Sequence, residues 1–490
     1  MPIQRKITQL SRRTSHLRRR SAGPPSFFKL FLLIGSALLL LLLFSFMAGS
    51  MLVFPHSNNP GSKQPMSASK KSSSSAVIWT SKTSKNYYGC SEPSAQFLSQ
   101  GSSQSSGYLV VEASGGLNQQ RTGIIDAVVA ARILNATLVV PCLDHASFWK
   151  DNSNFSDIFD EQHFITTLKN YVTIIKKLPR SYMNTKLPSV AIPRRSSENS
   201  FKDSILPILH KHKVVRLKKF DYRLANRLEE NLQKLRCKVN YHALQFTKSI
   251  KIMGTKLVER LRQRNERYIA LHLRFEPDML AFTGCYYGGG EKEINDMAKL
   301  RKQWKNIPHR NPEKARRNGR CPLTPEEVGL MLRALGYGSD TYLYVASGEI
   351  YGGETALAPL KQMFPNFFTK DTLSTKDELR PFSAYSSRLA AIDFVVCDQS
   401  DVFVTNNNGN MARMLSGRRR YFGHKRTIRP NAKKLKTLFA SRQNMTFEVF
   451  KAKLKRYQKG FMGDPMEMRP GRGQFFENPS ACICKKSNRV

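Results

Sequence analysis

The sequence has 490 residues and a formal net charge of +43, from 79 Lys and Arg against 36 Asp and Glu. Hydrophobic residues make up 40% of it, which excludes a disordered tail, and 29 Gly with 24 Pro are too few for a fibrous protein. The length indicates two domains with extensions. The positive charge is compatible with three kinds of partner: nucleic acid, a membrane surface, or anionic small molecules and polymers.

The first recognisable element is an uncharged apolar run over residues 30–54, followed by Pro55. At about 1.5 Å rise per residue, a helix of this length crosses a bilayer core of about 30 Å. Residues 1–29 carry basic charges and no acid, and positive flanks stay in the cytoplasm. We expect a cytoplasmic tail over 1–29 and a transmembrane signal-anchor over 30–54, with the body in a lumen; a cleaved signal peptide is the alternative.

Residues 55–106 form the next segment and are rich in Ser, Lys and Gly. They include one acid, Glu92, and too few apolar side chains to offset the entropy lost on ordering. We expect this segment to be a flexible luminal stem.

The body carries the marks of a secretory protein. Three N-glycosylation sequons begin at Asn135, Asn154 and Asn444. All eight cysteines lie beyond the anchor, where disulfides persist, and the best local pairing is Cys285 with Cys321, which would close the glycine-rich, charged loop between them. A luminal body removes most of the case for a nucleic-acid partner, so we expect none.

The body alternates strands and helices. Residues 108–113 predict a buried strand, 114–116 a glycine break, 125–133 a helix and 136–141 a second strand. Further strands are predicted over 172–175, 214–217, 267–274, 341–347 and 401–405, with helices over 220–261, 356–363 and 386–396 and a charged surface excursion over 291–320.

This alternation predicts an α/β fold of two Rossmann-like domains facing a central cleft. We place the N-terminal domain at 107–262, the C-terminal domain at 263–440 and a C-terminal extension at 441–490. Ligands of such folds bind beyond the carboxyl ends of the strands, so the cleft is the expected site.

The glycine break after the first strand is the first candidate for chemistry. Gly115 and Gly116 let backbone N–H groups approach a pyrophosphate, and the following helix, with Asn118 in its first turn, adds its dipole. A tight turn without a ligand is the alternative. The full GxGxxG fingerprint is absent, which disfavours a redox cofactor.

The strand over 267–274 ends in charged residues. Alternation places His272 and Arg274 on one face, next to the cleft. Arginine offers a bidentate fork for phosphate oxygens. A surface ion pair between Arg274 and Glu276 is the alternative.

A third candidate lies in the last helix–strand pair. Asp393 stands inside an apolar helical stretch, where a carboxylate is costly unless it has a partner. A nucleoside base or ribose could be that partner, and so could a backbone N–H. The Asn- and Gly-rich run over 406–410 follows a strand and can cradle phosphate.

The sequence contains no Asp-X-Asp triplet of the kind that holds a divalent metal in many glycosyltransferases. We therefore expect no metal site. Cationic side chains would then neutralise a departing diphosphate, and Arg274 is the best candidate.

Taken as an ordered set, these loops resemble the plant O-fucosyltransferase-like family. That family includes rhamnogalacturonan I rhamnosyltransferases and is distantly similar to the animal protein O-fucosyltransferases. The resemblance covers about residues 107–440. The motifs that carry it are Gly-Gly-Leu-Asn-Gln-Gln-Arg (115–121), His-Leu-Arg-Phe-Glu (272–276), Ser-Gly-Glu-Ile-Tyr (347–351), Asp-Val-Phe-Val to Gly-Asn-Met-Ala (401–412) and Gly-His-Lys-Arg-Thr-Ile (423–428).

The resemblance implies a GT-B-like fold, a nucleotide-sugar donor, inversion at the anomeric carbon, and no metal or other cofactor. Arg274 maps to the arginine that contacts the donor diphosphate and assists its departure, and is the expected catalytic residue. Asp393 maps to the acid that holds the nucleoside. The full set of implied substrate-binding residues is Gly115, Gly116, Asn118, His272, Leu273, Arg274, Asp393, Asn410 and Met411.

Three positions, in two loops, differ from the family pattern. Asn410 and Met411 stand in the later phosphate loop where the animal enzymes have small hydroxyl and aromatic residues. Gly115 stands where some relatives carry a glutamate as general base. Glu112, Glu276 and Asp278 are substitutes for that base by proximity, and a dissociative path without a base also fits.

The implied function is a Golgi type II membrane glycosyltransferase that moves a 6-deoxyhexose to a glycan or protein hydroxyl, with L-fucose from GDP-fucose as the first candidate. The basic body also suits an acidic polysaccharide acceptor, so a UDP-rhamnose-dependent pectin rhamnosyltransferase of the cell wall is one alternative. A non-catalytic Golgi glycan-binding relative is the other, because the glutamate is missing.

Overall fold

A computed structural model describes residues 78–99, 104–146, 150–183, 185–304, 307, 310–468 and 474–486. The chain divides into a unit of residues 1–69 and a unit of residues 70–490, and every described residue lies in the second unit. The predicted tail and the predicted anchor over 30–54 therefore lie outside the described residues. None of the described helices is long and apolar enough to span a bilayer.

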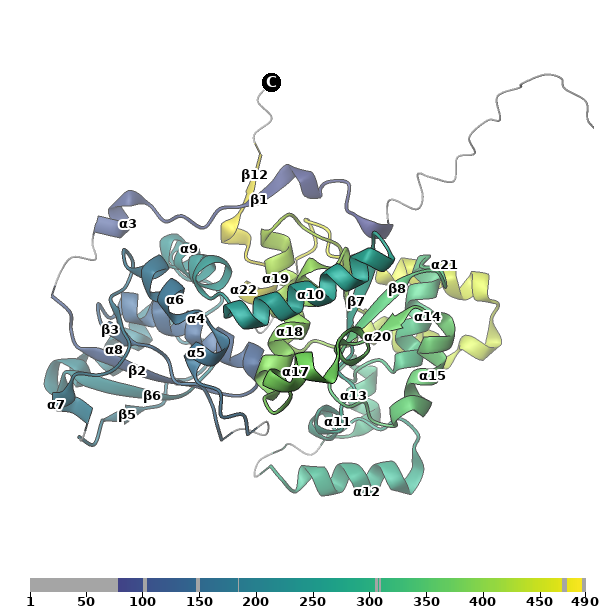
Figure 1. The fold of residues 1–490 in the computed structure, drawn as a ribbon, viewed down its shortest axis with the longest axis horizontal. Coiled ribbons are helices and arrows are strands. Elements are labelled where there is room, and N and C mark those ends of the chain that lie inside the picture. Colours follow the sequence, from purple (N-terminus) through teal and green to yellow (C-terminus); the bar gives the residue numbers. More distant parts are fainter. Residues whose placement is uncertain are drawn as a thin grey trace, which may run out of the picture. The chain divides into compact units, whose positions relative to one another are not determined.

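Two five-stranded sheets, each entirely parallel, organise the body (Figure 1). The first has the order β4-β3-β2-β6-β5. Its strands are β2 (Tyr108–Ala113), β3 (Thr137–Val139), β4 (Ile174–Ile175), β5 (Ser189–Val190) and β6 (Val214–Phe220). The second has the order β11-β10-β7-β8-β9. Its strands are β7 (Tyr268–His272), β8 (Tyr342–Ala346), β9 (Phe367–Phe368), β10 (Val402–Thr405) and β11 (Thr427–Ile428).

The strands follow from their sequence. Every residue of the apolar β7 is buried, as expected for a strand covered on both faces. His272, at its end, is in register with Ala346 of β8 and Thr405 of β10, so three strand ends meet at one edge. The predicted α/β class with parallel sheets is confirmed.

Helices surround both sheets. Those of the N-terminal part are α3 (Ala95–Ser99), α4 (Leu117–Ile133), α5 (Phe155–Ile158), α6 (Glu161–Leu168), α7 (Arg180–Met183), α8 (Glu198–His212), α9 (Glu230–Cys237) and α10 (Lys248–Arg264), with a π-helical turn over Lys238–Ala243. Those of the C-terminal part are α11 (Pro277–Thr283), α12 (Gly290–Arg301), α13 (Pro312–Arg317), α14 (Pro325–Leu335), α15 (Gly353–Met363), α16 (Lys370–Leu373), α17 (Lys376–Ser383), α18 (Ser386–Gln399), α19 (Asn410–Tyr421), α20 (Ala432–Ala440), α21 (Phe447–Gln458) and α22 (Gln474–Glu477).

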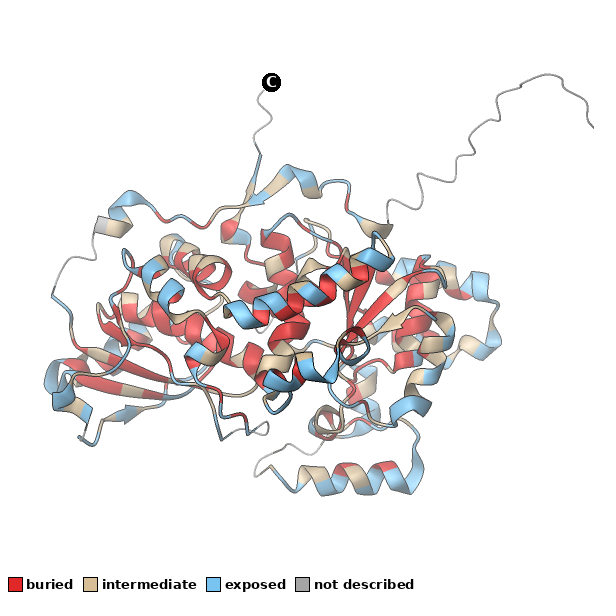
Figure 2. Ribbon diagram, viewed as in Figure 1, coloured by how far each residue is buried: buried red, intermediate tan, exposed pale blue. Residues whose placement is uncertain are grey.

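Alternation along β7 divides the core in two. Tyr268 and Ala270 belong to the core that also contains the first sheet, α4, α18 and α19. Ile269 and Leu271 belong to a second core with α14 and α20. Strands β3, β7 and β10 are buried along their whole length, and 14 of the 17 residues of α4 are buried (Figure 2). The second sheet is thus shared by both cores, which fixes its strand ends relative to α4 and α18.

Helix α10 packs directly against α18 (Figure 1). Gly254 permits the close approach, because a Cβ at this position would lie 2.6 Å from the Cβ of Val395. This contact holds α18 across the second sheet.

Part of the predicted flexible stem is ordered in the structure. Residues 78–99 lie against the body, where β1 (Tyr87–Gly89) pairs antiparallel with β12 (Ile483–Lys485) (Figure 1). Disulfides Cys90–Cys484 and Cys237–Cys482 fix these two ends. Composition does not predict that residues 78–99 are ordered, because their order comes from strand pairing and disulfides with residues far along the chain.

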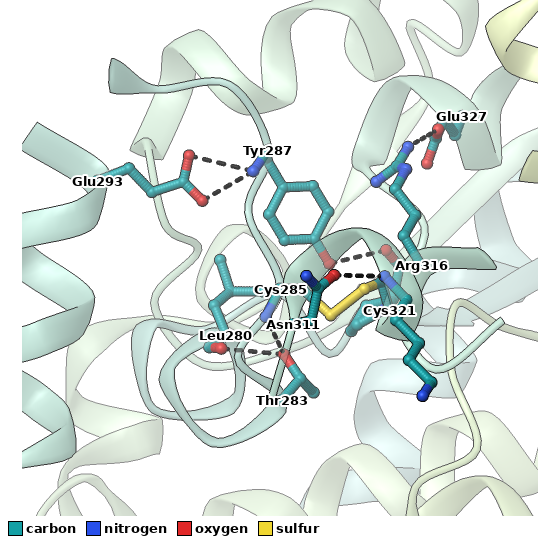
Figure 3. Close-up of a disulfide and its surroundings, with 11 residues drawn as sticks. Leu280, Thr283, Cys285, Tyr287, Glu293, Asn311, Arg316, Cys321 and Glu327 are labelled. Carbon is teal, nitrogen blue, oxygen red and sulfur yellow. Dashed lines mark hydrogen bonds and ion pairs between the residues drawn. A yellow bond between two sulfur atoms is a disulfide. The ribbon is translucent and has the colours of Figure 1, made fainter. Parts of the chain in front are cut away.

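The predicted Cys285–Cys321 disulfide is present (Figure 3). The Tyr287 hydroxyl donates to Pro322 O at 2.9 Å, and Glu293 accepts from Tyr287 N at 2.9 Å. The charged excursion closed by this crosslink contains two helices, α12 and α13, that its poor periodicity does not predict. The outward-facing sides of both helices are largely exposed (Figure 2). Charged residues occupy these positions, so the sequence shows little of the apolar repeat that predicts a buried helix.

Candidate functional site

The glycine loop leads from β2 into α4. Gly115 has a φ of +86°, which favours glycine, and a Cβ there would lie 2.5 Å from the side chain of Gln119. Its N–H donates to Asp144 Oδ2 at 2.8 Å. Asn118 is 6% exposed, and within the part of the chain that the structure describes its buried Oδ1 has no hydrogen-bond donor. The start of α4, capped by Gly116, therefore places a spare acceptor beside the positive end of a helix dipole.

The starts of α4 and α19 are joined by side-chain hydrogen bonds. Asn410 Nδ2 donates to Gln119 Oε1 at 3.3 Å, and the Tyr222 hydroxyl donates to Asn410 Oδ1 at 2.8 Å. Gln119 also donates to Asp221 Oδ2 at 2.7 Å. The structure thus brings together the two loops that the sequence assigns to phosphate, with two helix N-termini in one place.

Two of the predicted substrate-binding residues have core side chains. Leu273 is fully buried in the second core, and Met411 is buried in the first. Their side chains hold the loops in position, and the polar groups that they offer to a ligand are those of the backbone.

Arg274 lies just beyond the end of β7 and is held by acids. Its side chain is 16% exposed and forms ion pairs with Glu276 at 2.9 Å and Asp278 at 2.7 Å. Its backbone N–H donates to Asn406 Oδ1 at 2.9 Å, next to the end of β10. The Arg274–Glu276 pair considered as an alternative exists, but it is largely buried at the strand-end edge.

The guanidinium of Arg274 stays protonated at this position. Burial acts to lower the pKa of its guanidinium, but Glu276 and Asp278 outweigh burial and raise it. A ligand phosphate would therefore meet a fully charged guanidinium and compete with two carboxylates for its donors.

His272 is a neutral neighbour of this pair. Burial, and then the positive charge of Arg274, lower its pKa to about 3. Among the described residues, its buried Nδ1 has no hydrogen-bond partner. The ring is therefore an uncharged group at the end of β7 with one free ring nitrogen.

Asp393 takes side-chain partners rather than either of the two alternatives raised by its sequence context. It accepts from the Tyr344 hydroxyl at 2.6 Å and from Lys370 Nζ at 3.1 Å, and Lys370 also donates to Ser347 O at 2.7 Å. Burial raises the pKa of Asp393, and Lys370 opposes that shift. The pair lies beneath the loop that follows β8, on the same edge as Arg274.

The described side chains give no candidate metal site. In the part of the chain that the structure describes, no group of three or more His, Cys, Asp and Glu could hold a metal ion. Positive groups near this edge include Arg274, Lys370 and the two helix N-termini, and Arg194 pairs with the Asp221 that Gln119 contacts.

A family model confirms what the motifs indicate. The model for GDP-fucose protein O-fucosyltransferase matches residues 108–422. O-fucosyltransferase 6 of Arabidopsis thaliana is 60% identical over 413 residues, covering 84% of this chain and 73% of that protein. O-fucosyltransferase 16 of the same plant is 61% identical over 410 residues, covering 83% and 72%. The chain belongs to the O-fucosyltransferase family. It is a glycosyltransferase.

Solved structures of POFUT1 are also similar to this O-fucosyltransferase family member. One, in complex with GDP, has a TM-score of 0.40 and 14% identity, covering 67% of this chain and 99% of that one. Another, in complex with GDP-fucose, has a TM-score of 0.39 and 12% identity, covering 67% and 99%.

Three polar residues of this O-fucosyltransferase site were not singled out in the sequence. Lys370 follows β9 in a short helix, and no local pattern marks it as the partner of Asp393. Tyr222 follows β6 and reaches Asn410 across 188 positions of sequence. Asn406 stands in the recognised Asn-rich run, and its position directly after a strand was the signal that could have identified it.

The sequon residues lie apart from this edge. Asn154 and Asn444 are exposed. Asn135 is partly buried, has a φ of +47°, and donates through Nδ2 to Gln104 O at 3.0 Å. Glycosylation at the three positions stays a prediction, and at Asn135 the sugar would be attached to the same Nδ2 that makes this hydrogen bond.

Proposed function

We propose that this chain transfers L-fucose from GDP-fucose to a hydroxyl group of a glycan or protein. The reaction inverts the anomeric carbon and uses no metal and no cofactor beyond the donor. We further propose that it takes place in the Golgi lumen, with the body held by the anchor over 30–54. Support comes from the family model, whose description names GDP-fucose, and from the position of Arg274 at the end of β7.

Arg274 carries the proposed chemistry. Departure of the nucleoside diphosphate leaves negative charge on its phosphate oxygens, and a preorganised guanidinium stabilises that charge. The donor would take over the guanidinium fork from Glu276 or Asp278, which keep Arg274 oriented until then. The helix dipoles at Gly116 and Asn410 add positive potential.

The charge of the chain bears on the acceptor. Residues 107–490 carry a formal net charge of +31, which favours an acidic acceptor polymer over a neutral one. This observation keeps a second candidate in view, the transfer of rhamnose from UDP-rhamnose to a pectic backbone.

A donor panel tests the proposal. The full chain is incubated with GDP-fucose, UDP-rhamnose, GDP-mannose and UDP-glucose, and release of the nucleoside diphosphate is measured with and without neutral and acidic oligosaccharides. Turnover confined to GDP-fucose supports the proposal. Turnover confined to UDP-rhamnose assigns the second candidate, and turnover with neither contradicts both.

A further inference from the structure

Arg121 ends the Gly-Gly-Leu-Asn-Gln-Gln-Arg motif and has no role in the site above. Its side chain is 2% exposed, and among the described residues it has no hydrogen bond or ion pair. Its guanidinium lies 4.6 Å from the ring centroid of Phe394 and 5.1 Å from that of Phe246. Aromatic faces attract a cation, but they leave its N–H donors without acceptors. A buried charge in this state is costly unless another group meets it.

Arg121 lines a cavity of about 160 Å³. The remaining walls include Phe394 and Asp398 of α18, Lys251 of α10 and Arg418 of α19. Lys251 is exposed, so the cavity reaches the surface at this residue. Since one water occupies about 30 Å³ of liquid, the space suits a few waters or one small anion.

The charges around this cavity do not balance. Asp398 is engaged by Arg418, whose Nε donates to Asp398 Oδ2 at 2.6 Å. Arg121 and Lys251 remain as cations, and Lys251 has no ion pair within the described residues. Burial, and then Arg418, lower the pKa of Arg121 to about 9, which leaves it charged at neutral pH. The described residues that line the cavity therefore leave it with a net positive charge.

Arg121 follows Asn118 by about one turn of α4, but the far walls of the cavity lie away from the candidate donor site. Arg418 stands in the last turn of α19, whereas Asn410 begins that helix. Eight residues of helix separate them by about 12 Å. Asp398 likewise lies at the end of α18, beyond Asp393. An occupant of the cavity would contact α4, α10, α18 and α19 at once, and all four helices pack in the first core.

We propose that this cavity binds a small oxyanion, a carboxylate, sulfate or phosphate group, with Arg121 as its main contact and Lys251 at the entrance. Arginine suits this role because its planar fork matches two oxygens of such a group. The bound anion supplies the acceptors that the guanidinium lacks and stabilises the packing of α4 against α18.

Calorimetric titration of the full chain with inorganic phosphate, sulfate and acetate, at constant ionic strength set with chloride, tests the proposal. We expect one saturable site for at least one of the three. R121M should weaken binding about tenfold or more, since a hydrogen bond to a charged group contributes about 1.5–3 kcal/mol. K251Q, at an exposed position where folding is not at risk, should weaken it by a smaller factor.

Two controls separate this site from the donor site. Anion affinity should be unchanged in R274Q and in the presence of saturating GDP. Equal affinity in wild type and in folded R121M, or no saturable binding of any of the three anions, would overturn the proposal. Loss of binding in R274Q or with GDP would also overturn it, by assigning the anion to the donor site.

Discussion

Arg274 has two competing sets of partners, its own acids and the phosphates of a donor. Glu276 and Asp278 hold the Arg274 guanidinium at the end of β7 in the free protein. These two ion pairs do not stabilise the negative charge of a departing diphosphate. We expect R274A to lower kcat with the correct donor by about 10²–10³-fold, the usual loss when one preorganised donor is removed. Steady-state release of GDP measures it.

An exposed arginine provides the control for this prediction. Arg380 has a side chain that is 79% exposed and pairs with Asp377 at the surface. R380A removes the same charge from the chain, so we expect its turnover to match the wild type. A turnover of R274A within about twofold of R380A would remove the basis of the proposed mechanism, because a lost electrostatic contact to the leaving group should cost far more.

His272 connects the site to the pH dependence of stability. The folded state keeps this ring neutral down to about pH 3, whereas an unfolded histidine binds a proton near pH 6.5. The unfolded state therefore takes up more protons as the pH falls between these values, and the free energy of unfolding decreases.

We expect H272N to lose less stability than the wild type when the pH is lowered from 7 to 5, by about 2 kcal/mol, since one unit of pKa shift corresponds to about 1.4 kcal/mol. Urea unfolding at both pH values measures the difference. H210N, at an exposed position, should keep the wild-type pH dependence. An unchanged pH dependence in H272N would show that His272 is protonated alike in both states.

At the scale of elements, the strands that carry the site were predictable because each is a short apolar run ending in polar or glycine residues. Gly115, Arg274 and Asn406–Asn410 follow the ends of β2, β7 and β10. The sequence therefore placed them in loops at the carboxyl edge of a parallel sheet. The partners of these residues were not predictable. Lys370, at the start of α16, reaches Asp393 of α18 across 23 positions of sequence, and no periodicity in the sequence encodes that contact.

The α10–α18 contact is an element-scale feature with a direct test. G254A introduces a Cβ 2.6 Å from that of Val395, and relief of this overlap costs about 1–3 kcal/mol of unfolding free energy. We expect G254A/V395A to recover part of this loss, because V395A removes the Cγ1 methyl, which also lies 2.6 Å from the new Cβ, while the overlap with the Cβ of residue 395 remains. I252A, on the exposed face of α10, should stay within about 0.5 kcal/mol of wild type. Additive effects of G254A and V395A would contradict the proposed close approach.

At the scale of the molecule, two crosslinks decide how the ends of the described chain are held. The sequence predicted Cys285–Cys321 because its 36-residue separation makes it local, whereas Cys90–Cys484 and Cys237–Cys482 span 394 and 245 residues. Nothing in local pattern relates Cys90 to a position so distant. The ordering of residues 78–99 was missed for the same reason.

These long-range crosslinks should matter to stability more than the local one. Closing a longer loop removes more entropy from the unfolded chain, and a native disulfide contributes about 2–4 kcal/mol. We expect C90S/C484S to lower the unfolding free energy by at least as much as C285S/C321S, because β1 then holds β12 by strand pairing alone. Non-reducing chemical denaturation of the two double variants measures both losses. A wild-type midpoint for C90S/C484S would contradict this prediction and would mean that packing against α19 holds β1 and β12. In α19 the Tyr421 hydroxyl lies 2.9 Å from Ser91 Oγ. Adding S91A to C90S/C484S should in that case lower the unfolding free energy.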